Sequence, residues 1–221
     1  MPKNAKVQSG KVIIHGQGTD HLEIEQSTHK SILNWDSFSV HKGGRVDFNM
    51  PSSKSSSLNR VTGSTPSTIA GQIHSNGKVL LINPNGVAIT KNGVVNTGSF
   101  AASTLDIKNN DFLEDIYSFN GKENPKGVEN SGKIVVGGGG NASLLGGYVS
   151  NEGTILARLG KVSLGSGKQI TLDFVGDGLN IPAWRIGGGQ GWCIFGRNGS
   201  GKQLLDRLLV GELSTEAGLV D

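Results

Sequence analysis

Apolar and polar residues alternate over short distances along this chain, a pattern that favours strands over helices. Apolar runs such as residues 79–82 and 87–89 are separated by turn signals, the sharpest of which is NPNG at residues 83–86. Proline presets φ at the second position of a turn, and Asn-Gly accepts the positive φ that a tight reversal needs. Charge is almost absent here and Asn-Gly pairs recur on both sides, so we expect a coil of short strands rather than a hairpin.

A repeat of 20 to 21 residues underlies this pattern. The sequence V-x-N-x-G-x-Φ, where Φ is apolar, starts at Val128 and again at Val149, and we take Val94 to start a third copy displaced by an insertion. A second motif, Ser-Leu followed by glycine, recurs at Ser143 and Ser163. A unit this short cannot bury its own apolar face, so successive units must stack and share one core.

Stacked units made of strands and turns form a solenoid, and parallel β crossings are right-handed in nearly all proteins. We therefore predict an all-β fold, a right-handed parallel β-helix. About 180 residues at ~20 per turn allow about nine turns at most, in a rod roughly 40 Å long. A β-sandwich is the alternative, which we disfavour because its strands do not repeat in sequence. For the repeated asparagines we predict structural roles, as left-handed corners or as stacked amide ladders, with sugar or ion binding as the alternative.

Three stretches depart from the repeat. Residues 49–57 are polar and predict a flexible loop. In residues 34–40, strand alternation predicts that Trp35 and Phe38 point to opposite sides, one into the core and one capping an edge.

Residues 108–127 break the glycine rhythm with acidic and aromatic residues. Phe112, Leu113 and Ile116 have helical spacing, so we predict either a short helix or a hairpin excursion that decorates the main body.

Composition narrows the function classes. The 35 glycines fall between β-branched runs and are explained by turns, while aromatic residues make up only 5%. A net charge of +3 without a basic, aromatic-rich run argues against nucleic-acid binding. Cys193 is the only cysteine, which excludes an intramolecular disulfide and a cysteine-based zinc site. No apolar run is long enough to span a bilayer, so we expect no membrane insertion.

Catalytic patterns are missing from the sequence. No paired carboxylates recur at the spacing of the repeat, and no nucleophile–histidine pattern stands out. The spacings of His15, His21 and His29 do not suit a metal site. We therefore predict a protein that is not an enzyme and that uses no metal or cofactor.

The end of the chain, residues 187–221, follows a different pattern. A strand-like run leads into a GxxxxGK sequence at residues 196–202, and leucines at helical spacing follow it. This stretch resembles the Walker A region of ATP-binding-cassette ATPases, so the alternative function is a fragment or fusion carrying a nucleotide-binding P-loop. The residues that would bind the nucleotide are Gly196, Asn198, Gly199, Gly201 and Lys202.

Two features argue against a working P-loop. Gln203 stands where the magnesium-binding Ser or Thr belongs, and the chain ends at Asp221, which leaves no room for a Walker B strand. We predict a non-functional region, either poorly packed or forming a helix that caps the open end of the solenoid.

A family resemblance rests on motifs that occur in order between residues ~5 and 180: NWDSF, LNRVTG, INPNG and ASTLDI. Together they resemble the two-partner secretion (TPS) domain of filamentous-haemagglutinin-type exoproteins. The resemblance implies that residues 1–186 form an amino-terminal secretion module of a bacterial adhesin, haemagglutinin, haemolysin or contact-dependent inhibition toxin. It also implies a transporter-recognition and structural motif, with no catalytic role, made of Asn34, Trp35, Asn59, Arg60, Asn83, Pro84, Asn85 and Gly86.

The resemblance also implies partners and a location. The partner would be a dedicated outer-membrane transporter with periplasmic POTRA-type domains, and a host cell surface could be contacted only through a passenger outside this chain. The exoprotein would be secreted or surface-bound after crossing the periplasm. No apolar segment typical of a signal peptide follows Lys3 and Lys6, so either the chain is not exported by a signal peptide or the sequence begins after a cleavage site. The resemblance favours the second alternative.

Overall fold

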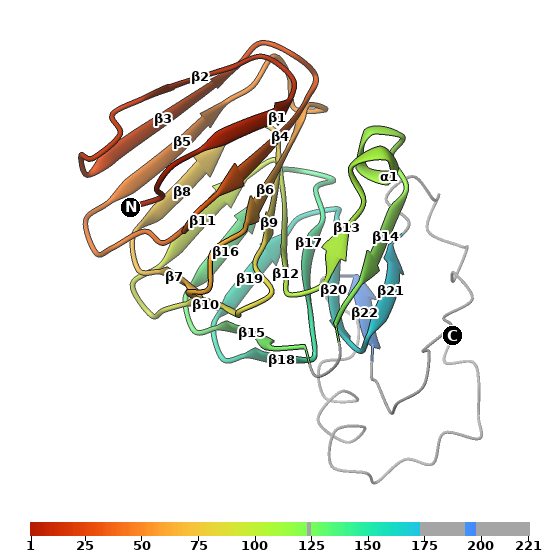
Figure 1. The fold of residues 1–221 in the computed structure, drawn as a ribbon. Coiled ribbons are helices and arrows are strands. Elements are labelled where there is room, and N and C mark those ends of the chain that lie inside the picture. The colour runs from red at the N-terminus through yellow and green to blue at the C-terminus, as the bar shows by residue number, and fades with distance from the viewer. Residues whose placement is uncertain (123–124, 173–192, 198–221) are drawn as a thin grey trace, which may run out of the picture.

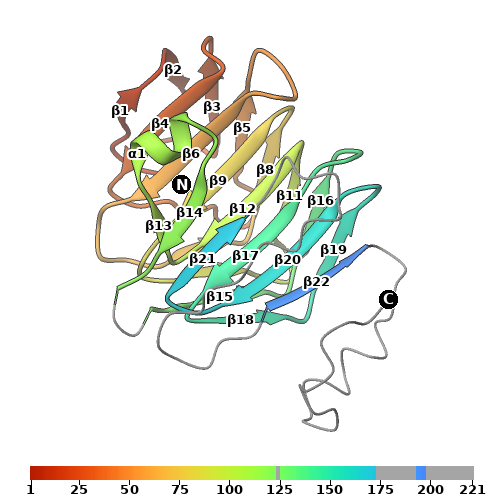
Figure 2. The ribbon, with the colours of Figure 1, turned by 90° about the vertical axis from the view of Figure 1, so that its right-hand side faces the viewer.

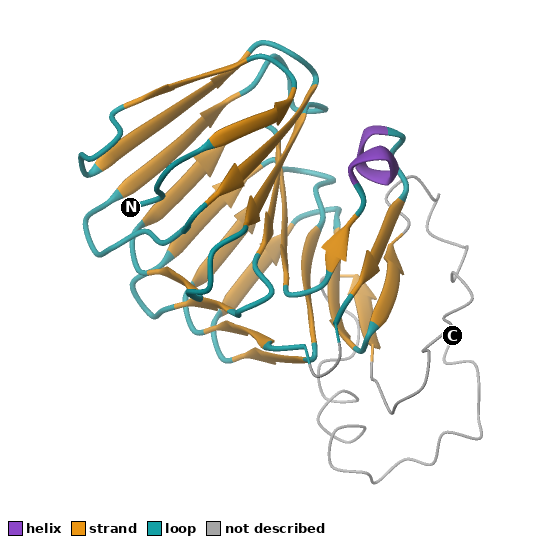
Figure 3. Ribbon diagram, in the orientation of Figure 1, coloured by secondary structure: helices purple, strands orange, loops and turns teal. Residues whose placement is uncertain are grey.

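The computed structural model describes residues 1–122, 125–172 and 193–197. The chain winds as a coil in which successive turns add strands side by side to three sheets (Figure 1). The described residues are nearly all strand and loop, with one short helix, α1 (Asn109–Leu113) (Figure 3). The coil has about seven turns, fewer than the chain length alone would allow.

The first sheet, which we call the long sheet, has eight strands. In spatial order they are β1 (Lys6–Ser9), β4 (Lys30–Trp35), β6 (Ser56–Val61), β9 (Lys78–Ile82), β12 (Ser99–Ser103), β17 (Ala142–Gly146), β20 (Lys161–Ser166) and β22 (Cys193–Arg197). The strands from β4 to β20 pair in parallel, whereas β1 and β22 pair antiparallel at the two ends.

Two further sheets complete the coil. The seven-stranded sheet has the order β2 (Val12–His15), β3 (His21–Gln26), β5 (Arg45–Asn49), β8 (Gln72–Ser75), β11 (Val94–Thr97), β16 (Lys133–Val136) and β19 (Thr154–Ala157). The four-stranded sheet has the order β7 (Ser67–Ile69), β10 (Val87–Ile89), β15 (Gly127–Asn130) and β18 (Tyr148–Asn151). Apart from the antiparallel pair β2–β3, their strands pair in parallel. The predicted parallel β-helix is therefore confirmed, and the sandwich alternative is wrong.

The strand register confirms two of the repeats and corrects the third. Val128 pairs with Val149, and Ser143 with Ser163, as the 20-residue periodicity predicts. Val94, however, pairs with Lys133, while the partner of Val128 on the preceding turn is Val87. The stretch starting at Val94 therefore lies in a different sheet from the stretches starting at Val128 and Val149. Its sequence similarity to them does not correspond to an equivalent position in the coil.

The asparagine and glycine of the repeat hold neighbouring turns together. The Asn130 amide donates a hydrogen bond to Asn151 Oδ1 at 2.7 Å and accepts one from the Gly132 amide at 3.1 Å. A Cβ at Gly132 would collide with the carbonyl oxygens of Thr90 and Gly93 on the preceding turn. The predicted amide ladder is thus present between these two turns. The left-handed corners are not, because the repeat asparagines have no positive φ.

Alternation along the strands gives the coil a continuous apolar core. In β5 the side chains of Val46 and Phe48 are buried, while Arg45 and Asn49 face solvent. In β9 both faces are buried, because Leu80 and Ile82 lie beneath a further layer on the outside of the coil.

The predicted opposition of Trp35 and Phe38 is wrong. Strand β4 ends at Trp35 and the chain bends, so alternation does not extend to Phe38. Both rings are 1% exposed and pack edge to face, with centroids 5.4 Å apart and planes at 88°. The predicted loop is also shorter than expected, because β5 continues to Asn49 and β6 begins at the buried Ser56.

The excursion after the fourth turn contains both a helix and a hairpin. Strands β13 (Asp106–Ile107), β14 (Tyr117–Asn120) and β21 (Gln169–Leu172) form an antiparallel outer sheet, with α1 at its tip (Figure 2). Its side chains form a second core with the outward face of the long sheet, and Phe112 and Phe119 are fully buried there. The excursion is therefore an integral layer and not the decoration that we predicted.

The predicted tail falls largely outside the described residues. Strand β22 lies within it and pairs antiparallel with β20, with Gly196 opposite Val162. Gly196, the first glycine of the GxxxxGK sequence, is thus part of a strand rather than of a phosphate-binding loop. Asn198, Gly199, Gly201 and Lys202 lie outside the described residues.

Candidate functional site: the NPNG turn and the tethers of the outer sheet

The NPNG sequence forms a turn between β9 and β10. The Gly86 amide donates to the Asn83 carbonyl at 3.1 Å, and Gly86 has φ 116°, which L side chains rarely adopt. Asn83 is fully buried, and its Oδ1 accepts hydrogen bonds from the backbone and the side-chain amide of Asn85, at 2.9 and 3.0 Å. Pro84 is half-buried between them. The predicted turn and its positive φ at Gly86 are confirmed.

The two asparagines of this turn fasten the loop that precedes β7. Asn83 Nδ2 donates to the Thr65 carbonyl at 3.0 Å and to Ser67 Oγ at 2.9 Å. Asn85 Nδ2 donates to the Gly63 carbonyl at 2.8 Å. Each amide therefore satisfies backbone groups of the preceding turn, and an aliphatic side chain would leave those groups without a partner.

Trp35 and Asn59 belong to a second, buried polar cluster between β4 and β6. The Trp35 indole N–H donates to Asn59 Oδ1 at 3.0 Å, and Asn59 Nδ2 donates to Ser57 Oγ at 3.1 Å. Ser31 continues the cluster, since its hydroxyl donates to Gln26 Oε1 at 2.6 Å and lies within hydrogen-bond distance of Ser57 Oγ, at 3.1 Å. These groups satisfy one another inside the coil.

Arg60 and Asn34 lie on the outward face and hold the outer sheet. Arg60 Nε donates to Asp106 Oδ1 at 2.8 Å, and Nη2 donates to the Ile107 carbonyl at 2.7 Å. Nη1 donates to the side-chain oxygens of Asn109 at 3.0 Å and Asn34 at 3.4 Å. The Arg60 side chain is only 14% exposed, so it is committed to this tether.

Lys30 is a second tether, which the sequence did not reveal. Its Nζ donates to the carbonyls of Phe112 and Leu113, at 3.2 and 2.7 Å, and pairs with Asp115 at 2.8 Å. A cation at the C-terminal carbonyls of a helix is favourable, and the ammonium also lies 5.8 Å from the Phe112 ring centroid. A single lysine in an ordinary strand gives no signal of a partner more than 80 residues away in sequence.

This tether carries the clearest electrostatic shifts of the outer sheet. Burial raises the pKa of the Asp115 carboxyl, but the hydrogen bond and charge of Lys30 outweigh it, so the pKa lies below 3.8. Burial also raises the pKa of Tyr117 well above its ordinary value, and its bond to Asp115 adds to the effect.

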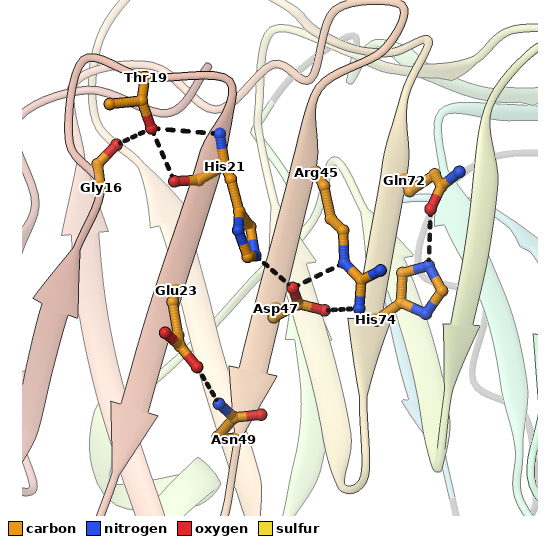
Figure 4. A network of polar contacts seen from close by, with 9 residues as sticks. All are labelled: Gly16, Thr19, His21, Glu23, Arg45, Asp47, Asn49, Gln72 and His74. Carbon is orange, nitrogen blue, oxygen red and sulfur yellow. Dashed lines mark hydrogen bonds and ion pairs between the residues drawn. The ribbon is translucent and has the colours of Figure 1, made fainter.

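A polar network covers the solvent face of the seven-stranded sheet, which holds none of the predicted motif residues (Figure 4). Asp47 accepts hydrogen bonds from Arg45 at 2.7 and 2.8 Å and lies 2.6 Å from His21 Nε2. Burial alone raises the pKa of Asp47, but Arg45 and His21 outweigh it and lower the pKa. Asn49 donates to Glu23 at 2.6 Å, so the carboxylates on neighbouring strands are each neutralised or hydrogen-bonded.

The predicted motif residues support the fold in this structure. The eight predicted motif residues split into the turn, the buried cluster and the outer tether. In the described ranges, Ser143 Oγ is the one buried side-chain oxygen or nitrogen without a partner. Within these ranges no group of three or more His, Cys, Asp or Glu residues is placed to hold a metal, and no helix is long and apolar enough to cross a membrane.

Together these features define a class: a parallel β-helix with antiparallel strands at its first turn and an outer sheet tethered across its side. The family model described as the TPS secretion domain matches residues 1–183. The chain belongs to this family, as the motifs predicted.

Individual proteins and a solved structure are also similar to this chain. The heme/hemopexin-binding protein of Haemophilus influenzae strain Rd is 31% identical over 191 residues, covering 82% of this chain and 21% of that protein. A second heme/hemopexin-binding protein from Haemophilus influenzae is 36% identical over 107 residues. The crystal structure of the HMW1 secretion domain from the same species superposes with a TM-score of 0.70 at 34% identity, covering 77% of this chain and 46% of that one. This chain thus spans about a fifth of the length of the first relative.

These matches do not support the nucleotide-binding alternative. The similarity is to secretion domains, and Gly196 lies in a strand. We therefore set the P-loop interpretation aside.

Proposed function

We propose that this chain is the amino-terminal secretion module of a longer exoprotein, which its own outer-membrane transporter exports to the medium or the cell surface. The observation that carries the proposal is the family match over residues 1–183, on a coil whose motif residues bind one another. The module has no catalytic role, and its partner is the transporter. Heme or hemopexin binding is stated for the relatives and lies outside this proposal.

The transporter contacts the module through periplasmic domains of the POTRA type. Residues 1–186 form the secretion domain, and residues 187–221 have no part in recognition.

Asn83–Gly86 serves recognition through the fold. Its two asparagine side chains bind the loop before β7, so loss of these contacts would free that loop and weaken the pairing of β10 with β7. Asn34 and Arg60 act in the same way on the outer sheet, since they fix the first half of the excursion.

Folding itself can drive export. Turns that pair non-locally are slow to form, so the chain stays competent for translocation until it emerges. Each turn that then stacks outside the cell buries apolar surface and opposes backward movement.

The test combines retention and secretion. The periplasmic part of the cognate transporter is immobilised and offered the chain; specific retention is expected, and its absence would contradict the proposal. In cells, Asn83→Ile and Asn85→Ile should abolish secretion at unchanged synthesis. Asn92→Ile is the matched control, because Asn92 is an exposed Asn-Gly residue elsewhere on the coil.

A further inference from the structure

Asparagine followed by glycine is a pair at which a peptide chain can modify itself, because glycine has no Cβ to shield its amide nitrogen. In the described residues this pair occurs four times, starting at Asn76, Asn85, Asn92 and Asn120. Three of these asparagines are exposed and Asn85 is half-buried. Exposure alone therefore does not separate the four pairs, and their contacts must be compared.

The reaction needs a side chain and a backbone nitrogen that can approach each other. The nitrogen of the glycine loses its proton and attacks the side-chain carbonyl carbon of the asparagine. As this C–N bond forms, a five-membered imide ring closes, and the side-chain nitrogen leaves as ammonia, taking up the proton that glycine lost. Water then opens the ring at one of its two carbonyls. The products are aspartate and isoaspartate, in which the backbone runs through the side chain and is one methylene longer.

Two of the four side chains are held by hydrogen bonds. The Asn76 side-chain oxygen accepts from the Met50 amide at 2.9 Å, and its nitrogen donates to the Met50 carbonyl at 2.7 Å. Asn85 Nδ2 donates to the Gly63 carbonyl at 2.8 Å and to Asn83 Oδ1 at 3.0 Å. Ring closure at either position must first break two hydrogen bonds, so the fold protects both pairs.

Asn120 is held by its backbone instead. It ends strand β14, where it pairs with Asp106 on one side and with Gln169 on the other. The amide of the following Gly121 donates to the Lys168 carbonyl at 2.7 Å. Bending this backbone into a ring would disrupt the outer sheet on both sides, so this pair is protected as well.

Asn92 has neither restraint. It lies in the corner between β10 and β11, which is closed by a hydrogen bond from the Gly93 amide to the Thr90 carbonyl at 2.8 Å. Its side chain is exposed and has no hydrogen-bond partner among the described residues. Opening the one bond of this corner leaves the glycine nitrogen free beside an unrestrained side-chain amide.

We infer that Asn92 is a site of spontaneous modification in the folded chain, where it is converted to aspartate and isoaspartate. The Gly93 nitrogen is the nucleophile, water is the co-reactant, and the reaction needs no enzyme. The inference rests on the contacts of the four pairs and not on the proposed function.

The two products differ in what they do to the corner. Aspartate adds a charge to a side chain that is already exposed. Isoaspartate lengthens the backbone beside Gly93, whose carbonyl accepts from the Lys133 amide at 2.9 Å, while the next amide, of Val94, donates to the Gly71 carbonyl at 2.9 Å. These bonds fix the corner to the turns on both sides, so the longer backbone should loosen the start of β11.

The first test follows all four pairs in the whole chain. Trypsin cleaves after lysine and arginine, which places the pairs in four different peptides: residues 61–78, 79–91, 92–108 and 109–122. The folded chain is incubated in mildly alkaline buffer and digested, and mass spectrometry measures the modified fraction at each pair, with fragment ions locating the site. A sample unfolded in urea is treated in parallel.

We expect Asn92 to be modified at least about tenfold faster than the other three asparagines in the folded chain, and at a similar rate to them in urea. Equal rates at all four pairs of the folded chain, or a faster rate at another pair, would overturn the inference. An unmodified Asn92 after a time that modifies the unfolded sample would overturn it too.

Matched variants separate the modification from its structural effect. Asn92→Gln keeps a side-chain amide but would have to close a less favourable, larger ring, so it should remain unmodified. Asn92→Asp carries the charge of the product without the longer backbone. After incubation, hydrogen exchange at the start of β11 should be faster in the wild type and unchanged in both variants. If Asn92→Asp exchanges as fast as the incubated wild type, or the modified wild type is unchanged, the inferred effect of isoaspartate is wrong.

Discussion

The coil and the outer sheet are held together by contacts of different range. In the coil, each residue meets partners about one turn away, as Asn130 meets Asn151 and Asn83 meets Ser67. In the outer sheet, Arg60 reaches Asp106 and Lys30 reaches Leu113, which are 46 and 83 residues away. A solenoid whose turns contact only their neighbours is quasi-one-dimensional, so the outer sheet is what couples distant turns.

The different contact ranges of the coil and the outer sheet also affect the order in which the two regions can fold. Strand β14 pairs with β21, which follows the last parallel strand of the long sheet. The coil can therefore grow turn by turn, but the outer sheet closes only when residues 169–172 are present.

The largest expected effect lies in the coil core. Phe100→Ala removes a fully buried ring and should lower the free energy of unfolding by about 3–5 kcal/mol. Phe119→Ala in the outer sheet is the comparison, and hydrogen exchange should show loss of protection in β13, β14 and β21 with the coil retained. Equal loss of protection in both regions would mean that they unfold as one unit.

The next effect concerns the NPNG turn. Asn83→Ala leaves the Thr65 carbonyl, Ser67 Oγ and the Asn85 amide without their partner, at a cost of about 2–3 kcal/mol in urea unfolding. Asn92→Ala should change the unfolding free energy by less than about 0.5 kcal/mol. If both substitutions lower the unfolding free energy by a similar amount, the side-chain hydrogen bonds of Asn83 are not the source of the effect.

A smaller effect is expected from the tethers. Arg60→Ala should speed amide exchange in the outer sheet about tenfold, equivalent to ~1.4 kcal/mol. The reason is that the Ile107 carbonyl and the side-chain oxygen of Asn109 lose their hydrogen-bond donor. Exchange in β5 and β8 should be unchanged. Arg45→Ala, on the exposed network of Figure 4, serves as the surface control and should have little effect on either region.

The smallest effect is a pH dependence of the Lys30 tether. The folded-state pKa of Asp115 lies below its ordinary value of 3.8, so the pair contributes stability above pH 3.8 and loses it as pH falls through the folded pKa. The carboxylate is half exposed, so the contribution should stay below about 1 kcal/mol. Acid titration of Asp115→Asn should show a shallower loss of outer-sheet protection than the wild type; an identical titration would exclude this role.

Short-range features were predictable from the sequence. The turn at Asn83–Gly86 and the pairing of Val128 with Val149 follow from turn chemistry and periodicity, and the family motifs identified the secretion domain. The prediction of a third copy at Val94 was wrong because a pattern with only four specified positions also fits a neighbouring strand. The proximity of Trp35 to Phe38 depended on where β4 ends, which alternation does not reveal.

Long-range features were not predictable. Nothing in the local sequence of Lys30 or Arg60 indicates a partner in the excursion, since one cation in a strand is compatible with many surroundings. The network around Asp47 likewise arises because parallel register brings His21, Arg45 and Asp47 together from two strands. These contacts therefore follow from the strand register and not from the local sequence.

The central claim is that the motif residues support secretion through the stability of the coil. Its most direct test measures secreted protein and the unfolding free energy for the same variants: Asn83→Ala, Asn85→Ala, Asn59→Ala and Arg60→Ala. The account predicts that secretion falls in the order in which stability falls. A variant that unfolds like the wild type but is no longer secreted would contradict the account.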